Sequence, residues 1–264
     1  MGRIIVLTSG KGGVGKTTIS TGIGAALAVS GKQVVLVDAD IGLNNLDMMM
    51  GIENKITYDM IDVIEGKCRL KQAIINDMYI SNLAVLPSSH AFDSDAVSSE
   101  NFRKLIFKLS EYFDYVLIDC PAGIEKGFHR AINAANEAII VTTAHTSAIR
   151  DADKVITLLT SYRKEITGLI INRMRGDLIM RGEMIGINEM GRLLHCKIIG
   201  TVPEDDDLVL YSQLGRIAEL DTRAGLAFRM IARNIESGAR HLYDCTEEYR
   251  GLLGKLKLRI RRDM

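Results

Sequence analysis

Residues 10–18, with the sequence GKGGVGKTT, lie between an apolar run at 4–7 and a segment of helical pattern that begins near Lys16. This stretch fits the pattern G-x-x-x-x-G-K-[ST], which forms a phosphate-binding loop when a strand precedes it and a helix follows it. Glycines at 10, 12, 13 and 15 allow positive φ and let bare backbone N–H groups approach phosphate oxygens. The sequence therefore predicts a nucleotide site where the first strand meets the first helix.

The motif predicts a role for each polar side chain of this loop. We expect Lys16 to reach the β and γ phosphates of ATP and the Thr17 hydroxyl to bind Mg²⁺. The first helical turn adds unpaired N–H groups and the positive end of its dipole. The residues expected to hold ATP are Gly12, Gly13, Val14, Gly15, Lys16, Thr17 and Thr18. An ordinary loop of this kind needs only Lys16, so Lys11 either points to solvent or contacts a phosphate, including one held by a second subunit.

On these residues the chain is identified as a member of a family. KGGVGKT at 11–17 resembles the deviant Walker A motif of the MinD/ParA ATPases, a group that includes the nitrogenase iron protein and the arsenite-pump ATPase. The resemblance implies a homodimer that forms on binding ATP, with Lys11 reaching the partner subunit's nucleotide. It makes Lys11 and Lys16 candidate catalytic residues of an ATP hydrolase that uses Mg²⁺.

The order of the predicted elements indicates an α/β fold. Short β-branched runs alternate with helical patterns, which is typical of a doubly wound, mostly parallel sheet flanked by helices. Strands are expected at 4–8, 33–38, 83–87, 115–119, 138–142, 168–172 and 198–202. With 264 residues, 47% of them hydrophobic, and only three prolines, we expect one ATPase domain over 1–246 and a basic tail over 247–264.

Acidic residues follow two of these strands, at the sheet edge where ligands of α/β proteins bind. Asp38 and Asp40 are two apart, and either can hold a water on Mg²⁺, orient the attacking water or cap a turn. Asp119 ends an apolar run, as a Walker B acid does, and is expected to bond the water shell of Mg²⁺ or the Thr17 hydroxyl. By resemblance, 37–47 is switch I, in which Asp40 positions the hydrolytic water and Asp38 lies near the metal.

Two further groups of residues gain a role mainly from the resemblance. Asn172, Pro203 and Glu204 end or follow strands and match the family's adenine contacts, although turn residues at strand ends would look the same. The charged residues Arg150, Asp151 and Asp153 begin a helix that is either a solvated face or, by resemblance, part of a partner-binding surface. The loop at 143–146 lacks the proline and the acid that relatives carry there.

The C-terminal tail separates the charge of the chain. Residues 250–264 hold six basic groups and one acid, while residues 1–249 hold 27 basic and 32 acidic groups, a formal charge of −5. In helical projection its apolar residues form a stripe flanked by cations, which is typical of an amphipathic helix on a membrane surface. A core-packed helix and a coil-forming tail are the alternatives. The residues expected to contact anionic lipid are Tyr249, Leu252, Leu253, Leu256, Ile260, Lys255, Lys257 and Arg259.

With this tail, the chain resembles the septum-site-selecting branch of the family. That branch implies a peripheral protein on the cytoplasmic face of the cell membrane, with a MinC-like division inhibitor and a MinE-like activator as partners. No nucleic-acid partner is expected, because the formal charge of the whole chain is zero. A ParA-type partition ATPase and a flagellar-number ATPase are the alternatives. Four scattered cysteines without C-x-x-C spacing argue against a metallocluster carrier.

Overall fold

The computed structural model describes residues 1–42, 44–88, 97–217, 219–251, 254 and 258 of the chain, and its centre is a sheet of eight strands. The strands follow the order β3-β4-β2-β5-β1-β6-β7-β8. Their bounds are β1 (Arg3–Thr8), β2 (Val34–Asp38), β3 (Ile75–Asn76), β4 (Leu83–Leu86), β5 (Tyr115–Asp119), β6 (Glu137–Thr143), β7 (Glu165–Met174) and β8 (Ile198–Pro203). Neighbouring strands are parallel except β3, which pairs antiparallel with β4 at the edge.

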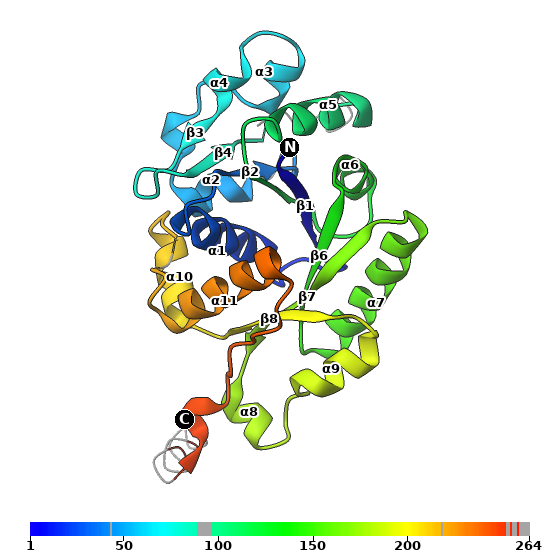
Figure 1. Ribbon diagram of the computed structural model, residues 1–264, viewed down its shortest axis with the longest axis vertical. Helices are drawn as coiled ribbons and strands as arrows, with labels where there is room; N and C mark the ends of the chain where they lie inside the picture. The colour runs from blue at the N-terminus through cyan, green and yellow to red at the C-terminus, as the bar shows by residue number, and fades with distance from the viewer. Residues whose placement is uncertain (43, 89–96, 218, 252–253, 255–257, 259–264) are drawn as a thin grey trace.

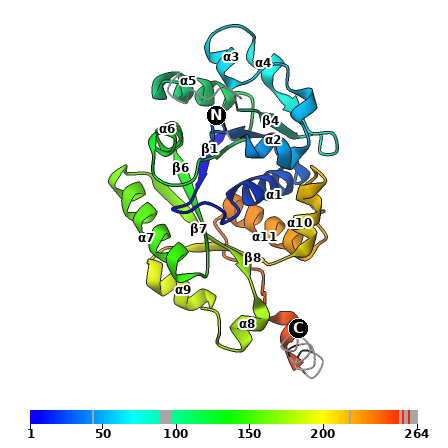
Figure 2. The same cartoon turned by 180° about the vertical axis from the view of Figure 1, so that it is seen from behind.

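Helices cover both faces of this sheet (Figures 1 and 2). One layer contains α1 (Lys16–Val29) and α11 (Arg223–Ser237), and the other contains α5 (Ser99–Leu109), α6 (Lys126–Ala134) and α7 (Thr146–Ser161). The shorter helices connect these layers or cap their ends. They are α2 (Asn45–Met50), η1 (Glu53–Lys55), α3 (Met60–Ile64), α4 (Leu70–Ala73), α8 (Gly176–Met180), α9 (Ile187–Leu194) and α10 (Asp206–Gln213).

The expected doubly wound sheet is confirmed, and burial explains why the sequence shows it. All five residues of β2 and of β5 are buried, so these strands read as continuous apolar runs rather than as alternating patterns. The edge strand β3 was not expected, because a strand of two residues leaves no periodic signal. The strand β7 begins at Glu165, earlier than the apolar run that predicted it, because its first residues are polar or partly exposed.

The start of the C-terminal tail packs on the body of the protein. The turn η3 (Glu247–Tyr249) lies against α8 (Figure 1), Tyr249 is 4% exposed, and Arg223 Nη1 donates a 2.7 Å hydrogen bond to Glu248 Oε1. The expectation that Tyr249 belongs to an exposed membrane stripe is therefore wrong in this structure, because its ring fills the space beside Gly176.

The rest of the expected membrane stripe is not part of the described structure. Seven of the residues expected to contact lipid lie outside the described residues, namely Leu252, Leu253, Lys255, Leu256, Lys257, Arg259 and Ile260. The amphipathic helix and the boundary after residue 246 therefore stay predictions. Among the helices of the described residues, none is both long enough and apolar enough to cross a bilayer.

Candidate nucleotide site

The glycine-rich loop lies between the end of β1 and the start of α1, at the carboxyl edge of the sheet. Gly15 is the N-cap of α1 with φ of 91°, and no side chain caps the helix, so the N–H groups of its first turn are available to an anion. Val14 is 4% exposed and anchors the loop in the core. The loop forms one wall of a cleft of about 610 Å³ that Lys16, Asp40 and Asp119 also line.

The metal-binding residues expected from the sequence meet below this loop. Thr17 Oγ1 donates a hydrogen bond to Asp119 Oδ2 at 2.6 Å, and Ser20 Oγ donates to Asp119 Oδ1 at 3.0 Å. Asp38 lies beside Asp119 in the register of β2 and β5. Its carboxylate accepts the backbone N–H groups of Asp40 at 2.9 Å and Leu46 at 3.2 Å, which ties switch I to the end of β2.

The carboxylates of Asp38, Asp40 and Asp119 repel one another in the partly buried site below the phosphate loop. Burial, then the charge of Asp119, raises the pKa of Asp38 well above its ordinary value. Burial also raises the pKa of Asp119, against the hydrogen bond from Thr17 and the charge of Lys16. The pKa of Asp40 is raised by burial as well, and Lys16 opposes the rise, so Lys16 and Asp40 interact within the site. A cation placed here would relieve the cost of ionising all three.

The chemistry of these donors fits Mg²⁺. A hydroxyl and buried carboxylates are the hard oxygen ligands this ion prefers, and Mg²⁺ usually keeps several waters and takes its other ligands from phosphates. Within the described part of the chain, no three His, Cys, Asp or Glu side chains converge into a closed metal cage.

Lys11 lies at the outer rim of the loop, beside α7. Its Nζ donates a hydrogen bond to Ser147 Oγ at 3.2 Å, and the neighbouring Gly10 packs against the backbone carbonyl of Asp151, where a Cβ would collide. Arg150 and Asp153 are exposed on the same helix. The structure thus places the helix that carries the expected partner-binding residues in contact with the phosphate loop.

The expected base contacts are only partly open. Asn172 Nδ2 donates to the carbonyl of Val14 at 2.8 Å, so the amide braces the phosphate loop, and its buried Oδ1 has no protein partner among the described residues. Pro203 ends β8, and the N–H of Glu204 donates to the carbonyl of Met174 at 3.1 Å. In this structure Asn172 therefore does not present a full donor and acceptor pair to a base.

Sequence reasoning missed several residues that line the site. Ser20 is three residues after Thr17 and so faces the same side of α1, a spacing that could have indicated it. The cleft is also lined by residues that no motif marks, namely Met48, Met49, Ser212, Gln213 and Arg173, the last of which has φ of 55°. Cys120 lines the cleft too, and burial raises the pKa of its thiol to about 12, so it is an unreactive filler.

Known proteins resemble this chain over nearly its whole length. A family model described as an AAA domain matches residues 2–171. The septum site-determining protein MinD of Bacillus subtilis is 44% identical over 261 residues, which cover 97% of each chain.

Solved structures give the same result. The MinC:MinD cell division protein complex of Aquifex aeolicus matches with a TM-score of 0.82 and 41% identity, over 90% of this chain and 97% of that one. The septum site-determining protein MinD of Pyrococcus horikoshii, complexed with Mg-ADP, matches with a TM-score of 0.81 and 28% identity, over 90% and 97% of the two chains.

Proposed function

This chain belongs to the MinD family of septum site-determining P-loop ATPases, and from that premise we propose that it uses ATP to place a division inhibitor on the cell membrane. The proposed cycle has three parts, which are ATP-dependent dimerisation, binding of the paired tails to anionic lipid, and release after partner-stimulated hydrolysis. Each part is supported by a different region of the chain.

For hydrolysis, we assign the residues that converge under the phosphate loop. Lys16 and the loop N–H groups would bind the β and γ phosphates, Thr17 and Asp119 would hold the metal with Asp38 beside them, and Asp40 would orient the attacking water. Mg²⁺, when bound with ATP, neutralises charge that develops on the phosphates. Asn172, Pro203 and Glu204 remain our candidates for the adenine end, with Asn172 offering its free Oδ1.

For dimerisation, the position of Lys11 is the main support. Its ammonium group lies at the exposed rim, bonded to Ser147, rather than in the cleft that its own chain offers to ATP. A second copy that faces this rim would present a γ-phosphate within its reach. We propose that Lys11 completes the partner subunit's site, so that the dimer forms only around ATP.

For membrane binding, the charge and the apolar stripe of the tail act together. Each basic residue near an anionic leaflet contributes on the order of 1 kcal/mol, and a single short amphipathic segment binds weakly and reversibly. Two tails in one dimer bind far more tightly, because the second insertion is intramolecular. ATP would thereby set the residence of the protein on the cytoplasmic face of the membrane.

For partners, we propose α7 as the docking element. Arg150 and Asp153 are exposed there, and Asp151 touches the phosphate loop through Gly10. A MinC-like inhibitor is supported by the Aquifex aeolicus complex, whose two components are named MinC and MinD. A MinE-like activator that binds the same helix would have a short path to Lys11 and the phosphates.

The observation that carries this function is a phosphate loop beside Asp38, Asp40 and Asp119, in a chain whose net positive charge lies in the tail. The test is co-sedimentation of the full chain with anionic vesicles in ATP, in ADP and without nucleotide. We expect binding in ATP only, and loss of binding in Lys11→Ala and in the triple variant Lys255→Glu, Lys257→Glu, Arg259→Glu.

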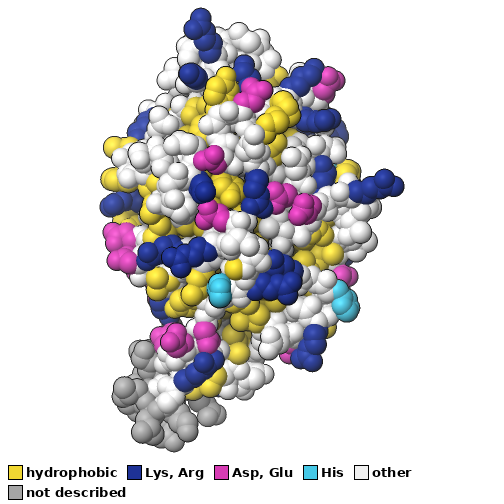
Figure 3. Space-filling view, viewed as in Figure 1, with side chains coloured by type: hydrophobic (Ala, Val, Ile, Leu, Met, Phe, Trp, Pro, Cys, Tyr) yellow, Lys and Arg dark blue, Asp and Glu magenta, His cyan; other side chains and the backbone are white. Residues whose placement is uncertain are grey.

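A matched control reverses three exposed cations on and after α11, Arg229→Glu, Arg233→Glu and Arg240→Glu. It carries the same change in charge and should bind vesicles as the unmodified chain does. Equal binding with and without nucleotide would refute the proposed switch. A partition-type function is disfavoured, since residues 1–249 are net acidic and basic and acidic side chains are interspersed on the face in Figure 3. Plasmid binding without lipid binding would reverse that judgement.

A further inference from the structure

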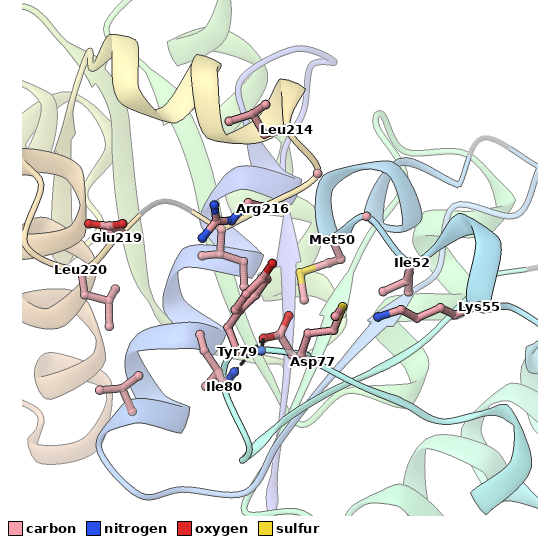
Figure 4. Close-up of a pocket in the computed structure, with 15 residues that line it drawn as sticks. Met50, Ile52, Lys55, Asp77, Tyr79, Ile80, Leu214, Arg216, Glu219 and Leu220 are labelled. Atoms are coloured by element: carbon pink, nitrogen blue, oxygen red, sulfur yellow. Dashed lines mark hydrogen bonds between the residues drawn. The ribbon is translucent and has the colours of Figure 1, made fainter.

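A second cleft lies behind the wall formed by α2 and α10. It has a volume of about 510 Å³, within the range of small-molecule sites, and is bounded by the end of α1, the residues after α2, the turn between β3 and β4 and the loop after α10 (Figure 4). The side chains that matter for its chemistry are Met50, Ile52, Lys55, Tyr79, Leu214 and Arg216. No residue of the proposed nucleotide site lines it.

Apolar side chains line this cleft both at the floor and at the rim. Met50 and Ile52 are 6% and 2% exposed at the floor, while Tyr79 and Leu214 are 70% and 60% exposed at the rim. Large apolar side chains that remain exposed around a hollow are typical of binding sites. A ligand with an apolar body would remove this rim from water.

The cleft is lined by two cations, Lys55 and Arg216, and two acids, Asp77 and Glu219, which differ in how their side chains are engaged. Asp77 Oδ1 accepts the N–H groups of Tyr79 and Ile80, each at 2.8 Å, and Glu219 lies near Tyr211, whose pKa it raises. The Arg216 guanidinium stacks on the Tyr79 ring, 4.8 Å from its centroid. Within the described residues neither Arg216 nor Lys55 forms an ion pair. The acids are thus engaged and the cations are available.

We propose that this cleft binds an amphipathic monoanion, a molecule with an aliphatic or aryl body and one carboxylate, sulfate or phosphate group. The body lies on Met50, Ile52 and Leu214, and the anionic group pairs with Arg216, whose planar guanidinium can donate two parallel hydrogen bonds. The Tyr79 ring already holds Arg216 in place, so less freedom is lost when the anion binds.

The position of the cleft couples this ligand to the nucleotide site. The backbones of Gly51 and Gly215 touch, since a Cβ on Gly51 would lie 2.6 Å from the Gly215 oxygen, and both residues have positive φ, 60° and 59°. Met48 and Ser212 line the nucleotide side of the same two segments. A ligand whose body lies on Met50 and Ile52 and whose anionic group pairs with Arg216 spans the segments that follow α2 and α10, so it stabilises the contact between them and tightens nucleotide binding.

The site can be located with a photoreactive diazirine analogue of decanoic acid on the full chain, below its micellar concentration. Mass spectrometry should find label in peptides that contain residues 50–55, 77–80 and 214–217. Label on residues 250–264, whose cations attract any fatty anion, serves as an internal reference. Decyl sulfate should compete for the cleft as decanoate does, and decylamine should not. Label confined to 250–264, or equal competition by decylamine, would overturn the proposal.

Two variants of exposed residues test the assigned contacts without disturbing the core. Arg216→Gln and Leu214→Ser should each lower labelling of the cleft by about tenfold, as expected when a charge-assisted or apolar contact is lost. Arg233→Gln, an exposed cation on α11, is the matched control and should leave labelling unchanged. Undiminished cleft labelling in Arg216→Gln would exclude the role of the guanidinium and with it the anionic class of ligand.

The coupling between this cleft and the nucleotide site is tested by measuring the affinity for Mg-ADP. Decanoate should lower the dissociation constant for Mg-ADP a few-fold in the unmodified chain, as site-to-site coupling typically does, and not in Arg216→Gln. An equal shift in both proteins would place the effect outside this cleft. A weaker affinity for Mg-ADP would mean that the ligand separates α2 from α10, contrary to the bridging that we infer.

Discussion

The acids at the two ends of the central sheet, which are buried or partly buried, have pKa values shifted in opposite directions. At the amino end, Glu137 at the start of β6 accepts Arg3 Nε at 2.8 Å and Thr167 Oγ1 at 2.8 Å. Burial alone would raise the pKa of Glu137, but the hydrogen bonds from Arg3 and Thr167 outweigh it and lower the pKa. At the carboxyl end, the pKa values of Asp38, Asp40 and Asp119 are all raised, chiefly by burial.

This difference separates stability from function. A paired carboxylate stabilises the fold when it is ionised, whereas clustered carboxylates without enough cations destabilise it. The carboxyl end of the sheet carries this electrostatic destabilisation in the unbound protein, and a bound cation can remove it. At the amino end, the charge of Glu137 is balanced within the chain by Arg3, which also donates to the Ile235 carbonyl at 2.6 Å.

The largest effect that this comparison predicts is on hydrolysis. Lys16→Ala removes the cation that faces Asp40 and the phosphates, and we expect the rate of phosphate release from Mg-ATP to fall by about 100-fold or more. Lys71→Ala removes an exposed cation far from the site and is the control. If Lys16→Ala keeps its activity within about threefold of the unmodified chain, Lys16 does not act in hydrolysis at the carboxyl end of the sheet.

A smaller effect is expected on stability at the amino end. Glu137→Gln leaves Arg3 without its charged partner, and we expect the free energy of unfolding to fall by about 2 kcal/mol. The melting temperature should then fall by about 4–8 °C, as measured by circular dichroism. Glu165→Gln, at an exposed residue paired in register with Glu137 across β6 and β7, should change it little. An equal loss in both variants would remove the special role of the Arg3 pair.

The same pair should titrate with a definite sign. The folded pKa of Glu137 is lowered, so its contribution is present above the ordinary value of 4.5 and is lost as the pH falls through the folded pKa. The stability gap between the unmodified chain and Glu137→Gln should therefore be largest near neutral pH and shrink as the pH falls below 4.5. A gap that stays constant down to the acid transition would show that the contact acts by packing rather than by charge.

Sequence reasoning reached further at the carboxyl end of the sheet than elsewhere, for a physical reason. Phosphate binding requires particular residue types at 10–18, and buried strands appear in the sequence as apolar runs. The loop, the sheet and the proximity of Thr17, Asp38 and Asp119 were therefore all predictable. The Arg3 pair was not, because its two members are 134 residues apart and follow no motif. Tyr249 was misjudged since its helical projection ignores the space beside Gly176.

The most delicate test concerns Asp38 in the nucleotide-free protein, in buffer that contains a chelator. Its folded pKa is raised, so folding binds a proton in the window between the ordinary value of 3.8 and the raised value, and the charged form destabilises the fold above that window. The unmodified chain should therefore lose stability relative to Asp38→Asn as the pH rises from 3.8 through this window. The sign is opposite to that of Glu137, and Mg-ADP should abolish the dependence, because the bound cation compensates the ionised carboxylate. A difference that is flat with pH, or unaffected by Mg-ADP, would mean that the two ends of the sheet handle their acids alike.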